Sequence, residues 1–413
     1  RYDIEGLMAQ TKSARSARDM GLLEVEFSKR FLAYARDIQT GVVVPSSIDP
    51  GLVRTVPYQD RATFLPEFAT ADPRDYLRDL PPRTPEYLAL MKEKLRLERE
   101  LARGGWGPTV PGKKLEFGQT GDAVVALRNR LIAKGYLERT TTRSFDLEIQ
   151  TAVLAFQTAH GLTPDGVAGG DTLAEINRSM QDRLQSVIVA MERERWLPRD
   201  RGERHIAVNL TDFSAKIYDS GKLTFETRSV IGKNTSDRRS PEFSDVMEFM
   251  VINPSWYVPR SIVTKEYLPQ LQQNPNAVGH IEITDSRGRR INREATDFSQ
   301  FTARSFPFAM RQPPSQSNAL GLVKFMFPNP YNIYLHDTPA KNLFGREVRA
   351  YSHGCIRLAD PFDFAYTLLA KQTPDPQWFF KSQLDTGKEI QVDLKEPVPV
   401  HIIYRTAFSD AKG

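Results

Sequence analysis

Cysteine is almost absent from this sequence. Cys355 is the one cysteine among 413 residues, and there are six histidines. A single cysteine excludes an internal disulfide, so packing must hold the fold together. No run of 18 apolar residues occurs, and the CxxC, HxxxH and HExxH spacings typical of zinc sites are missing. The sequence therefore predicts a globular protein without a spanning helix and without a standard zinc motif.

Strong charge clustering is also missing. The formal net charge is only +5, and the densest basic runs, DRRS, RGRR and MERERW, are short. Scattered basic residues usually form a solvated surface, so we expect no nucleic-acid partner. A mild positive field would also suit an anionic polymer. The chain begins RYDIEGLMAQ, without Met or an apolar signal core, which is compatible with a trimmed product from which a signal or membrane anchor was removed.

The first part of the chain reads as a helical scaffold. With about 150 residues per domain, this length predicts two or three domains. Leu23, Phe27 and Phe31 recur at helical spacing, and Thr84 is a good helix N-cap. The segment 41–73 is rich in Pro, Ser and Asp and is predicted to be a loop. Nothing in this part indicates chemistry.

Residues 117–178 predict a compact unit of three short helices. Apolar residues lie on one face of each of the first two predicted helices: Val124, Leu127 and Leu131, then Ile149, Val153 and Phe156. A PDG turn follows, and we expect Asp165 and Gly166 to face outward there. The next segment, 179–203, returns to helix and is expected to pack on the first helices. The three-helix unit would then be an insertion in the scaffold.

From Arg204 the pattern changes to alternating apolar and polar residues, which predicts at least seven β-strands. Two of them lie near the C-terminus, in KEIQVDL and VPVHIIYRTAF. Residues from about 260 to 315 interrupt the pattern with a predicted helix, a small hairpin and a loop around FPFAMRQPPSQSN. A long insertion of this kind is usually functional or mobile when it borders an active site, although it could also be a surface excursion without a role.

The stretch from Tyr334 to Asp360, YLHDTPAKNLFGREVRAYSHGCIRLAD, holds the candidate chemistry. A predicted strand, NIYL, delivers His336 at its end, and a glycine-containing turn presents Cys355 before a helix that Asp360 would cap. This arrangement suits a thiol nucleophile with an imidazole base. Three alternatives stay open: a buried, inert cysteine; a zinc site that uses His336, His353 and Cys355, with Asp337 as a further candidate ligand; and His353 rather than His336 as the base.

Two resemblances add to this interpretation. A histidine, a spacer and then SHGC with a hydrophobic residue and Arg resembles the signature of the L,D-transpeptidases, cysteine enzymes of the bacterial cell wall. The segment NALGLVKFMFPNPYNIYLHD also resembles that family, and MERERWLPRD resembles the segment before the catalytic domain in its large, multidomain Gram-negative type. The segment AVLAFQTAHGLTPDGVAGGDTL resembles the family of peptidoglycan-binding helical modules, which bind a sugar–peptide polymer and perform no chemistry.

The resemblance implies a multidomain α+β fold. We expect a helical scaffold at 1–116 and 179–203, an inserted peptidoglycan-binding module at 117–178, and a mostly-β catalytic domain at 204–413. In the resembling enzymes an insertion like that at about 260–315 forms a cap over the substrate groove.

The resemblance also implies roles for nine residues. The catalytic residues would be Cys355 as nucleophile, His336 as general acid and base, Asp337 as orienter through its backbone carbonyl, His353 as support, and Gly354 as part of an oxyanion hole formed by backbone N–H groups. The substrate-binding residues would be Ser352, Arg357, Tyr334 and Trp256. Arg357 could instead be structural, the Asp337 side chain could be the orienter, and Tyr334 and Trp256 could fill the core.

The implied reaction joins two diaminopimelate residues of neighbouring stem peptides in a 3-3 cross-link. A tetrapeptide stem would acylate Cys355 as a thioester, and an amine would then accept the acyl group; with water as acceptor the reaction would be that of a carboxypeptidase. We expect no metal or organic cofactor, peptidoglycan stem peptides and glycan as partners, and the periplasm of a Gram-negative bacterium as location. A zinc-dependent cell-wall peptidase or amidase and a non-catalytic wall-binding scaffold are the alternatives.

Overall fold

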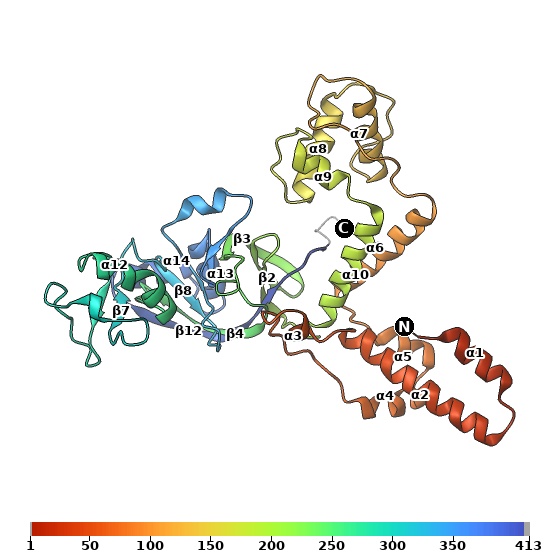
Figure 1. Ribbon diagram of the computed structural model, residues 1–413, viewed down its shortest axis with the longest axis horizontal. Coiled ribbons are helices and arrows are strands. Elements are labelled where there is room, and N and C mark those ends of the chain that lie inside the picture. The colour runs from red at the N-terminus through yellow and green to blue at the C-terminus, as the bar shows by residue number, and fades with distance from the viewer. Residues whose placement is uncertain (1, 409–413) are drawn as a thin grey trace. The chain divides into compact units, whose positions relative to one another are not determined.

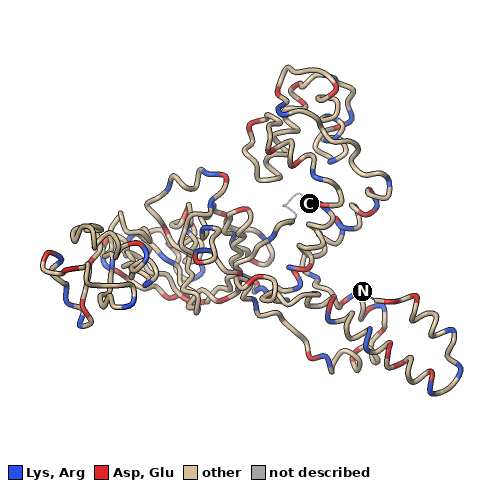
Figure 2. Tube along the Cα trace, in the orientation of Figure 1, with Lys and Arg blue, Asp and Glu red and all other residues tan. Residues whose placement is uncertain are grey.

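The computed structural model describes residues 2–408, which divide into two compact units (Figure 1). One unit is helical; it runs to Asp200 and takes in the chain again from Tyr404. The other, Arg201–Ile403, is mostly β. No helix in the described range is both long and apolar enough to cross a membrane. Along both units, Lys and Arg alternate with Asp and Glu (Figure 2).

The helical unit begins with a bundle and continues into a helix pair. Its helices before the inserted module are α1 Ile4–Ser13, α2 Ala17–Thr40, α3 Pro45–Ile48, α4 Arg61–Thr70, α5 Pro73–Asp79 and α6 Pro85–Ala102. After the module, α10 (Met180–Arg195) packs on α6 through a shared core that includes Leu90, Leu97, Val187 and Met191. The expectation that this later helix packs on the first helices is therefore confirmed.

The structure corrects the predicted loop at 41–73. Asp60 caps α4 by accepting a hydrogen bond from Ala62 N–H at 3.0 Å, and Phe64 of this helix is buried in the bundle core. Pro66 lies inside the helix rather than ending it. The prediction was wrong for this segment because Asp and Pro were interpreted as breakers, whereas here burial of Phe64 outweighs them.

The module contains α7 Asp122–Ala133, α8 Leu147–Ala159 and α9 Gly170–Ile176. Its core includes the apolar residues predicted for the two helix faces. Gln157 is buried at the centre of a polar network: its side-chain nitrogen donates to Asp165 at 2.8 Å and its oxygen accepts from Gly166 N–H at 2.9 Å. Asp165 is exposed as expected, but Gly166 is buried, because this network draws the turn inward.

The β unit is built on a nine-stranded sheet in the order β10-β3-β11-β9-β8-β4-β12-β1-β2. Strand β2 also pairs with β3, so the sheet closes on itself as a barrel. The strands are β1 Arg204–Asn209, β2 Ser214–Asp219, β3 Lys222–Gly232, β4 Ser244–Ile252, β8 Val323–Met326, β9 Leu335–His336, β10 Ala350–Ser352, β11 Ile356–Leu358 and β12 Ile390–Ile403. Helices α13 (Pro361–Leu369) and α14 (Pro376–Leu384) add Phe364 and Phe380 to its core.

Two expectations about the C-terminal part are corrected. The two predicted final strands are one, β12, with a register shift between Asp393 and Val398. Residues 404–408 belong to the helical unit and not to the β unit, contrary to the expected range 204–413, and Arg405 forms an ion pair there with the buried Glu194 of α10 at 2.5 Å. The rest of that range, 409–413, lies outside the described residues.

The insertion forms a small subdomain, which we call the cap and define as Trp256–Gln312. It contains α11 (Arg260–Ile262), a π-helical turn at Val263–Tyr267, α12 (Leu268–Gln273) and a three-stranded sheet of β5 (Trp256–Tyr257), β7 (Ala309–Gln312) and β6 (Glu282–Thr284). Its own buried core includes Leu271, Ile283 and Phe298. Strand β7 lies in the segment predicted to be a loop, where prolines masked the short alternating run.

Candidate active site

The candidate histidine lies on strand β9, and the candidate cysteine directly precedes the adjacent strand β11. Strand β9 pairs in parallel with β11, so that His336 is opposite Arg357, and Ile356 N–H donates to the Tyr334 carbonyl at 3.1 Å. The strand predicted at NIYL is shorter than expected and includes His336 itself, since Asn332 has a φ of 54° that interrupts extended backbone.

The turn before β11 is fixed by a local hydrogen-bond network. Gly354 has a φ of 120°, and a Cβ there would come within 3.2 Å of the Ile333 side chain, so this position favours glycine. The Ser352 hydroxyl donates to the Cys355 carbonyl and accepts from Gly354 N–H at 3.1 Å. From another loop, the Ser240 hydroxyl donates to the Gly354 carbonyl at 2.5 Å. We call residues 352–355 the catalytic turn.

This network bears on two predicted roles. Ser352 is buried, and its hydroxyl is used inside the turn, where it shapes the backbone around Cys355. The Gly354 N–H already donates to Ser352, so it is not a free oxyanion-hole donor. Among the described residues, the N–H of Cys355 has no hydrogen-bond partner, which leaves it available to a developing oxyanion.

Cys355 is partly buried, and its thiol donates to the Asn332 carbonyl at 3.4 Å. Burial raises the pKa of the Cys355 thiol to about 11, against the opposing effects of hydrogen bonds from Tyr334 and the positive charge of Arg357. At neutral pH Cys355 is therefore a thiol, and it needs a base to become a thiolate.

His336 is oriented by the backbone. Its side chain is buried, with 4% exposure, and Nδ1 donates to the Asp337 carbonyl at 2.5 Å. Since a carbonyl only accepts, Nδ1 carries the hydrogen and the neutral ring has its lone pair on Nε2. Burial and the nearby Arg357 charge lower the pKa of His336 to about 3, although hydrogen bonds to the Asp337 and Leu320 carbonyls oppose them.

The Asp337 side chain points to other partners. One carboxylate oxygen accepts from Lys341 at 2.6 Å and from Thr338 N–H at 2.7 Å, and the other accepts from Leu322 N–H at 2.9 Å. The orienting contact of His336 is thus with the Asp337 carbonyl, as the resemblance implied, and not with the carboxylate. In the resting state Cys355 and His336 do not form a thiolate–imidazolium pair, because the shifted pKa values of both side chains favour their neutral forms.

His353 lies on the catalytic turn but faces the cap. Its Nε2 lies 2.7 Å from the carboxylate of Glu266, which belongs to the π-helical turn of the cap. Because a carboxylate only accepts, His353 donates from Nε2. Within the described residues no hydrogen bond joins the Cys355 sulfur to either His336 or His353. Apo geometry of this kind is common, since catalytic hydrogen bonds often tighten only with substrate bound.

Arg357 has no acidic partner among the described residues, and its buried Nε has no hydrogen-bond partner. Burial lowers the pKa of its guanidinium, whereas the nearby Cys355 opposes that shift. A half-buried guanidinium without an anion beside the nucleophile fits the predicted role as an anchor for a substrate carboxylate.

The two aromatic candidates meet near the thiol. Burial, followed by the interactions with Cys355, raises the pKa of the Tyr334 hydroxyl well above its usual range, while a hydrogen bond from Trp256 opposes this shift. Trp256 also packs edge-on against Tyr267 of the cap, with ring centroids 6.4 Å apart. The structure therefore brings both residues to the nucleophile, although Trp256 belongs to the packing of the cap as well.

Three contributors were missed by sequence reasoning: Asn332, whose carbonyl accepts from the thiol, Ser240, which holds the turn, and Glu266, which contacts His353. No spacing or composition signal distinguishes these residues, because each reaches the site through tertiary packing. Among residues 2–408 no group of three His, Cys, Asp or Glu residues is arranged to hold a metal ion, and His353 is turned toward Glu266.

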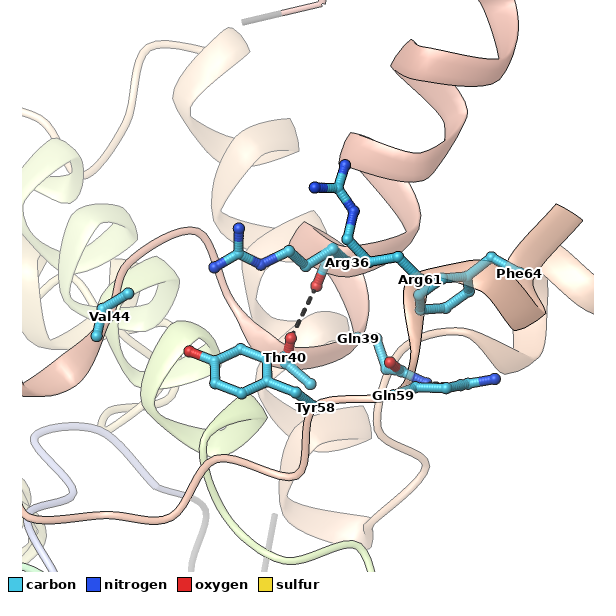
Figure 3. Close-up of a pocket in the computed structure, with 8 residues that line it drawn as sticks. All are labelled: Arg36, Gln39, Thr40, Val44, Tyr58, Gln59, Arg61 and Phe64. Carbon is cyan, nitrogen blue, oxygen red and sulfur yellow. Dashed lines mark hydrogen bonds between the residues drawn. The ribbon is translucent and has the colours of Figure 1, made fainter.

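A pocket of about 290 Å³ lies in the helical unit, and none of its lining residues is a predicted site residue. It is lined by Arg36, Gln39, Thr40, Val44, Tyr58, Gln59, Arg61 and Phe64 (Figure 3). Arg36 lies over the Tyr58 ring at 5.5 Å, and Phe64 contributes to the bundle core. Nothing in its lining resembles a nucleophile and base.

Comparison with known families gives three matches along the chain. Residues 203–399 match the YkuD family, described as "L,D-transpeptidase catalytic domain". Residues 120–176 match a family described as "Putative peptidoglycan binding domain". Residues 1–93 match a family described as "Scaffold domain".

Among curated proteins, the chain is similar to one described as "Putative L,D-transpeptidase" from Haemophilus influenzae. The two are 31% identical over 205 residues, which is 49% of this chain and 41% of the relative, so the match spans less than half of either protein.

Two solved L,D-transpeptidase structures are also similar. The one from Xylanimonas cellulosilytica is 16% identical, with 72% of this chain and all of that chain covered and a TM-score of 0.21. The one from Stackebrandtia nassauensis is 14% identical, with 73% and 98% covered and a TM-score of 0.28.

Proposed function

Since residues 203–399 match the L,D-transpeptidase catalytic domain and residues 120–176 match a putative peptidoglycan-binding domain, we propose that the chain is an L,D-transpeptidase that forms 3-3 cross-links in peptidoglycan. The donor is a tetrapeptide stem, and the nucleophile is Cys355. The observation that carries this proposal is the pairing of strands β9 and β11, which places a backbone-oriented imidazole beside the strand that the thiol precedes.

The reaction begins from a neutral thiol and a neutral imidazole. His336 Nε2 takes the thiol proton as the sulfur attacks the carbonyl of the third stem residue, so that a C–S bond forms. The Cys355 N–H stabilises the oxyanion. The imidazolium then gives its proton to the leaving amine as the C–N bond breaks, and the terminal D-amino acid departs. An acceptor amine then attacks the thioester carbonyl and gives a proton to His336. A new C–N bond forms as the C–S bond breaks, and the imidazolium returns the proton to the Cys355 sulfur.

The charges around the thiol support an anionic donor. Arg357 has no acidic partner in the described structure and lies on the strand that follows the nucleophile, where it could bind a stem carboxylate. The indole of Trp256 and the ring of Tyr334 would border the bound peptide. The module at 120–176 would hold the polymer, and the site of action would be the periplasm of a Gram-negative bacterium. The proposed mechanism has no step that requires a metal or organic cofactor.

The test is incubation with purified disaccharide-tetrapeptide, followed by mass analysis of the products. We expect a dimer joined through two third residues and one D-amino acid released per bond. The Cys355→Ala variant should give neither, because no second thiol exists in the chain. Release without dimers would identify a carboxypeptidase. A dimer joined through a fourth-residue carbonyl, or an active Cys355→Ala variant, would contradict the proposal.

A further inference from the structure

One carboxylate of the cap, that of Glu266, contacts both the catalytic turn and the loop that holds this turn. Oε1 of Glu266 lies 2.7 Å from Nε2 of His353, which is part of the turn, and 2.7 Å from an Nη atom of Arg238. Arg238 belongs to the loop after β3, and that loop carries Ser240, whose hydroxyl donates to the Gly354 carbonyl. Glu266 therefore touches the turn directly through His353 and indirectly through this loop.

The loop is itself held closely against the turn. Gly232 N–H donates to the Ser240 hydroxyl at 3.0 Å, and a Cβ at Gly232 would come within 2.1 Å of the Arg238 carbonyl. A backbone packed this tightly transmits a displacement instead of absorbing it. A shift of Arg238 would therefore move Ser240, and with it the Gly354 carbonyl that adjoins the nucleophile.

The position of Glu266 in the cap has two further features. It lies in the π-helical turn at Val263–Tyr267, and such turns are often found at functional sites. The next residue, Tyr267, packs against Trp256, whose indole affects the pKa of the Tyr334 hydroxyl beside the thiol. The same short segment thus approaches the nucleophile from two directions.

These contacts are poorly suited to stabilising the fold. The side chains of Glu266, Arg238 and His353 are 32%, 31% and 36% exposed, and ion pairs at such exposure contribute little to stability. Their geometry can still matter, because a displacement of about 1 Å at a reacting group can cost on the order of 100-fold in rate.

We propose that Glu266 is a positioning residue of the catalytic turn. Its carboxylate fixes His353 and Arg238 together, so the turn takes its reactive shape only when the cap is in place. The proposal rests on the proposed function, since it assumes that Cys355 is the nucleophile. It also gives His353 a defined place: the ring is held by the cap and supports the turn, while His336 acts as base.

The chain offers a matched control in the neighbouring residue. Lys265 lies in the same turn of the cap and pairs with Asp237 of the same loop at 3.0 Å, but it has no contact with the catalytic turn. A variant at Lys265 therefore weakens the attachment of the cap to the loop without releasing His353 or Arg238.

The experiment measures the rate at which a carbapenem acylates Cys355, by intact-protein mass, in the full chain. Glu266→Ala should slow acylation by about 10- to 100-fold with an unchanged unfolding temperature. Glu266→Gln can still accept a hydrogen bond from His353 but carries no charge for Arg238, so its acylation rate should lie between those of the wild type and Glu266→Ala. This variant replaces Glu266→Ala in the test if the alanine variant does not fold. Lys265→Ala should stay within about twofold of the wild type.

A double variant tests the route through His353. If Glu266 acts through this ring, Glu266→Ala combined with His353→Ala should be less impaired than the product of the two single effects. Acylation of Glu266→Ala and Glu266→Gln at the wild-type rate, or equal losses in Glu266→Ala and Lys265→Ala, would overturn the proposal. A wild type that is not acylated at all would instead contradict the proposed function.

Discussion

The barrel and the cap lie in the same unit but are built in opposite ways. The barrel joins strands that are distant in sequence: β1 pairs with β12, so that Ile206 is opposite Val400. The cap is one continuous segment with its own core, Trp256–Gln312. The proposed nucleophile, Cys355, and the proposed base, His336, are both in the barrel, whereas the cap contributes Trp256 and Glu266 at its edge.

This difference suggests that the barrel and the cap have different mechanical roles. A closed sheet with long-range pairing cannot adjust one strand without moving its neighbours, so it is a suitable place for groups whose distances must be fixed. A local subdomain that is joined by exchangeable ion pairs can open and close while its own fold stays intact. Four predictions test this contrast, from the largest expected effect to the smallest.

The barrel should hold the essential base. His336→Ala should reduce acyl transfer by about 10²- to 10⁴-fold, as expected for loss of a general acid–base group. His353→Ala should lose less, because its ring supports the turn from the cap side. Rates of D-amino acid release from the tetrapeptide measure both variants. The reverse ranking would move the base to His353 and would place the chemistry at the cap.

The cap should unfold without the barrel. Phe298 is 1% exposed in the core of the cap, so Phe298→Ala should cost about 3–5 kcal/mol of local stability. Hydrogen exchange should show lost protection in Trp256–Gln312 and unchanged protection in β12. The equally buried Phe364 of the barrel core is the matched control, since Phe364→Ala should lower protection throughout the barrel. Equal loss in both regions from Phe298→Ala would show that the cap is not a separate subdomain.

Acid should weaken the barrel through His336. The pKa of this ring is about 3 in the folded protein, below its ordinary value of 6.5, so the unfolded chain binds a proton that the folded chain does not bind. The contribution of His336 to the free energy of unfolding is fully present above about pH 6.5. It is lost as the pH falls toward 3, by at most about 1.4 kcal/mol per pH unit. Unfolding of the wild type and of His336→Gln at pH 7 and pH 4 should show the smaller loss in the variant. An equal loss in both would contradict this assignment.

The ion pair between Lys265 of the cap and Asp237 should contribute least to stability. The side chains of Lys265 and Asp237 are 60% and 49% exposed, and ion pairs so open to solvent often contribute nothing measurable. Lys265→Ala should therefore leave the unfolding temperature of the full chain unchanged. A clear drop would show that cap and barrel are coupled more tightly than their contacts suggest.

Much of this architecture is predictable from local pattern. Helical spacing predicted the apolar faces of the three-helix module, and alternation predicted a β domain from Arg204 onward. Local pattern failed where packing overrides it: α4 forms despite Pro66 because Phe64 is buried, and β12 remains one strand through a register shift. It also failed at β7, where flanking prolines masked a short strand of the cap.

The candidate site divides in the same way. Sequence identified Cys355, His336 and His353, because few thiol and imidazole groups exist in the chain and these three occur within one short stretch. It could not predict the contact between Ser352 and Gly354, because only the folded turn brings the Ser352 hydroxyl to the Gly354 N–H.

The sequence by itself thus determined which groups could do chemistry and the order in which the chain presents them. The tertiary structure decided the neutral state of the thiol and the imidazole, the choice of the Asp337 carbonyl over its carboxylate, and the contact of Glu266 with His353. The physical reason is that pKa values and hydrogen-bond partners depend on burial and on residues distant in sequence. Residue identity is local, whereas desolvation and the distance between groups exist only once the barrel has closed and the cap has folded.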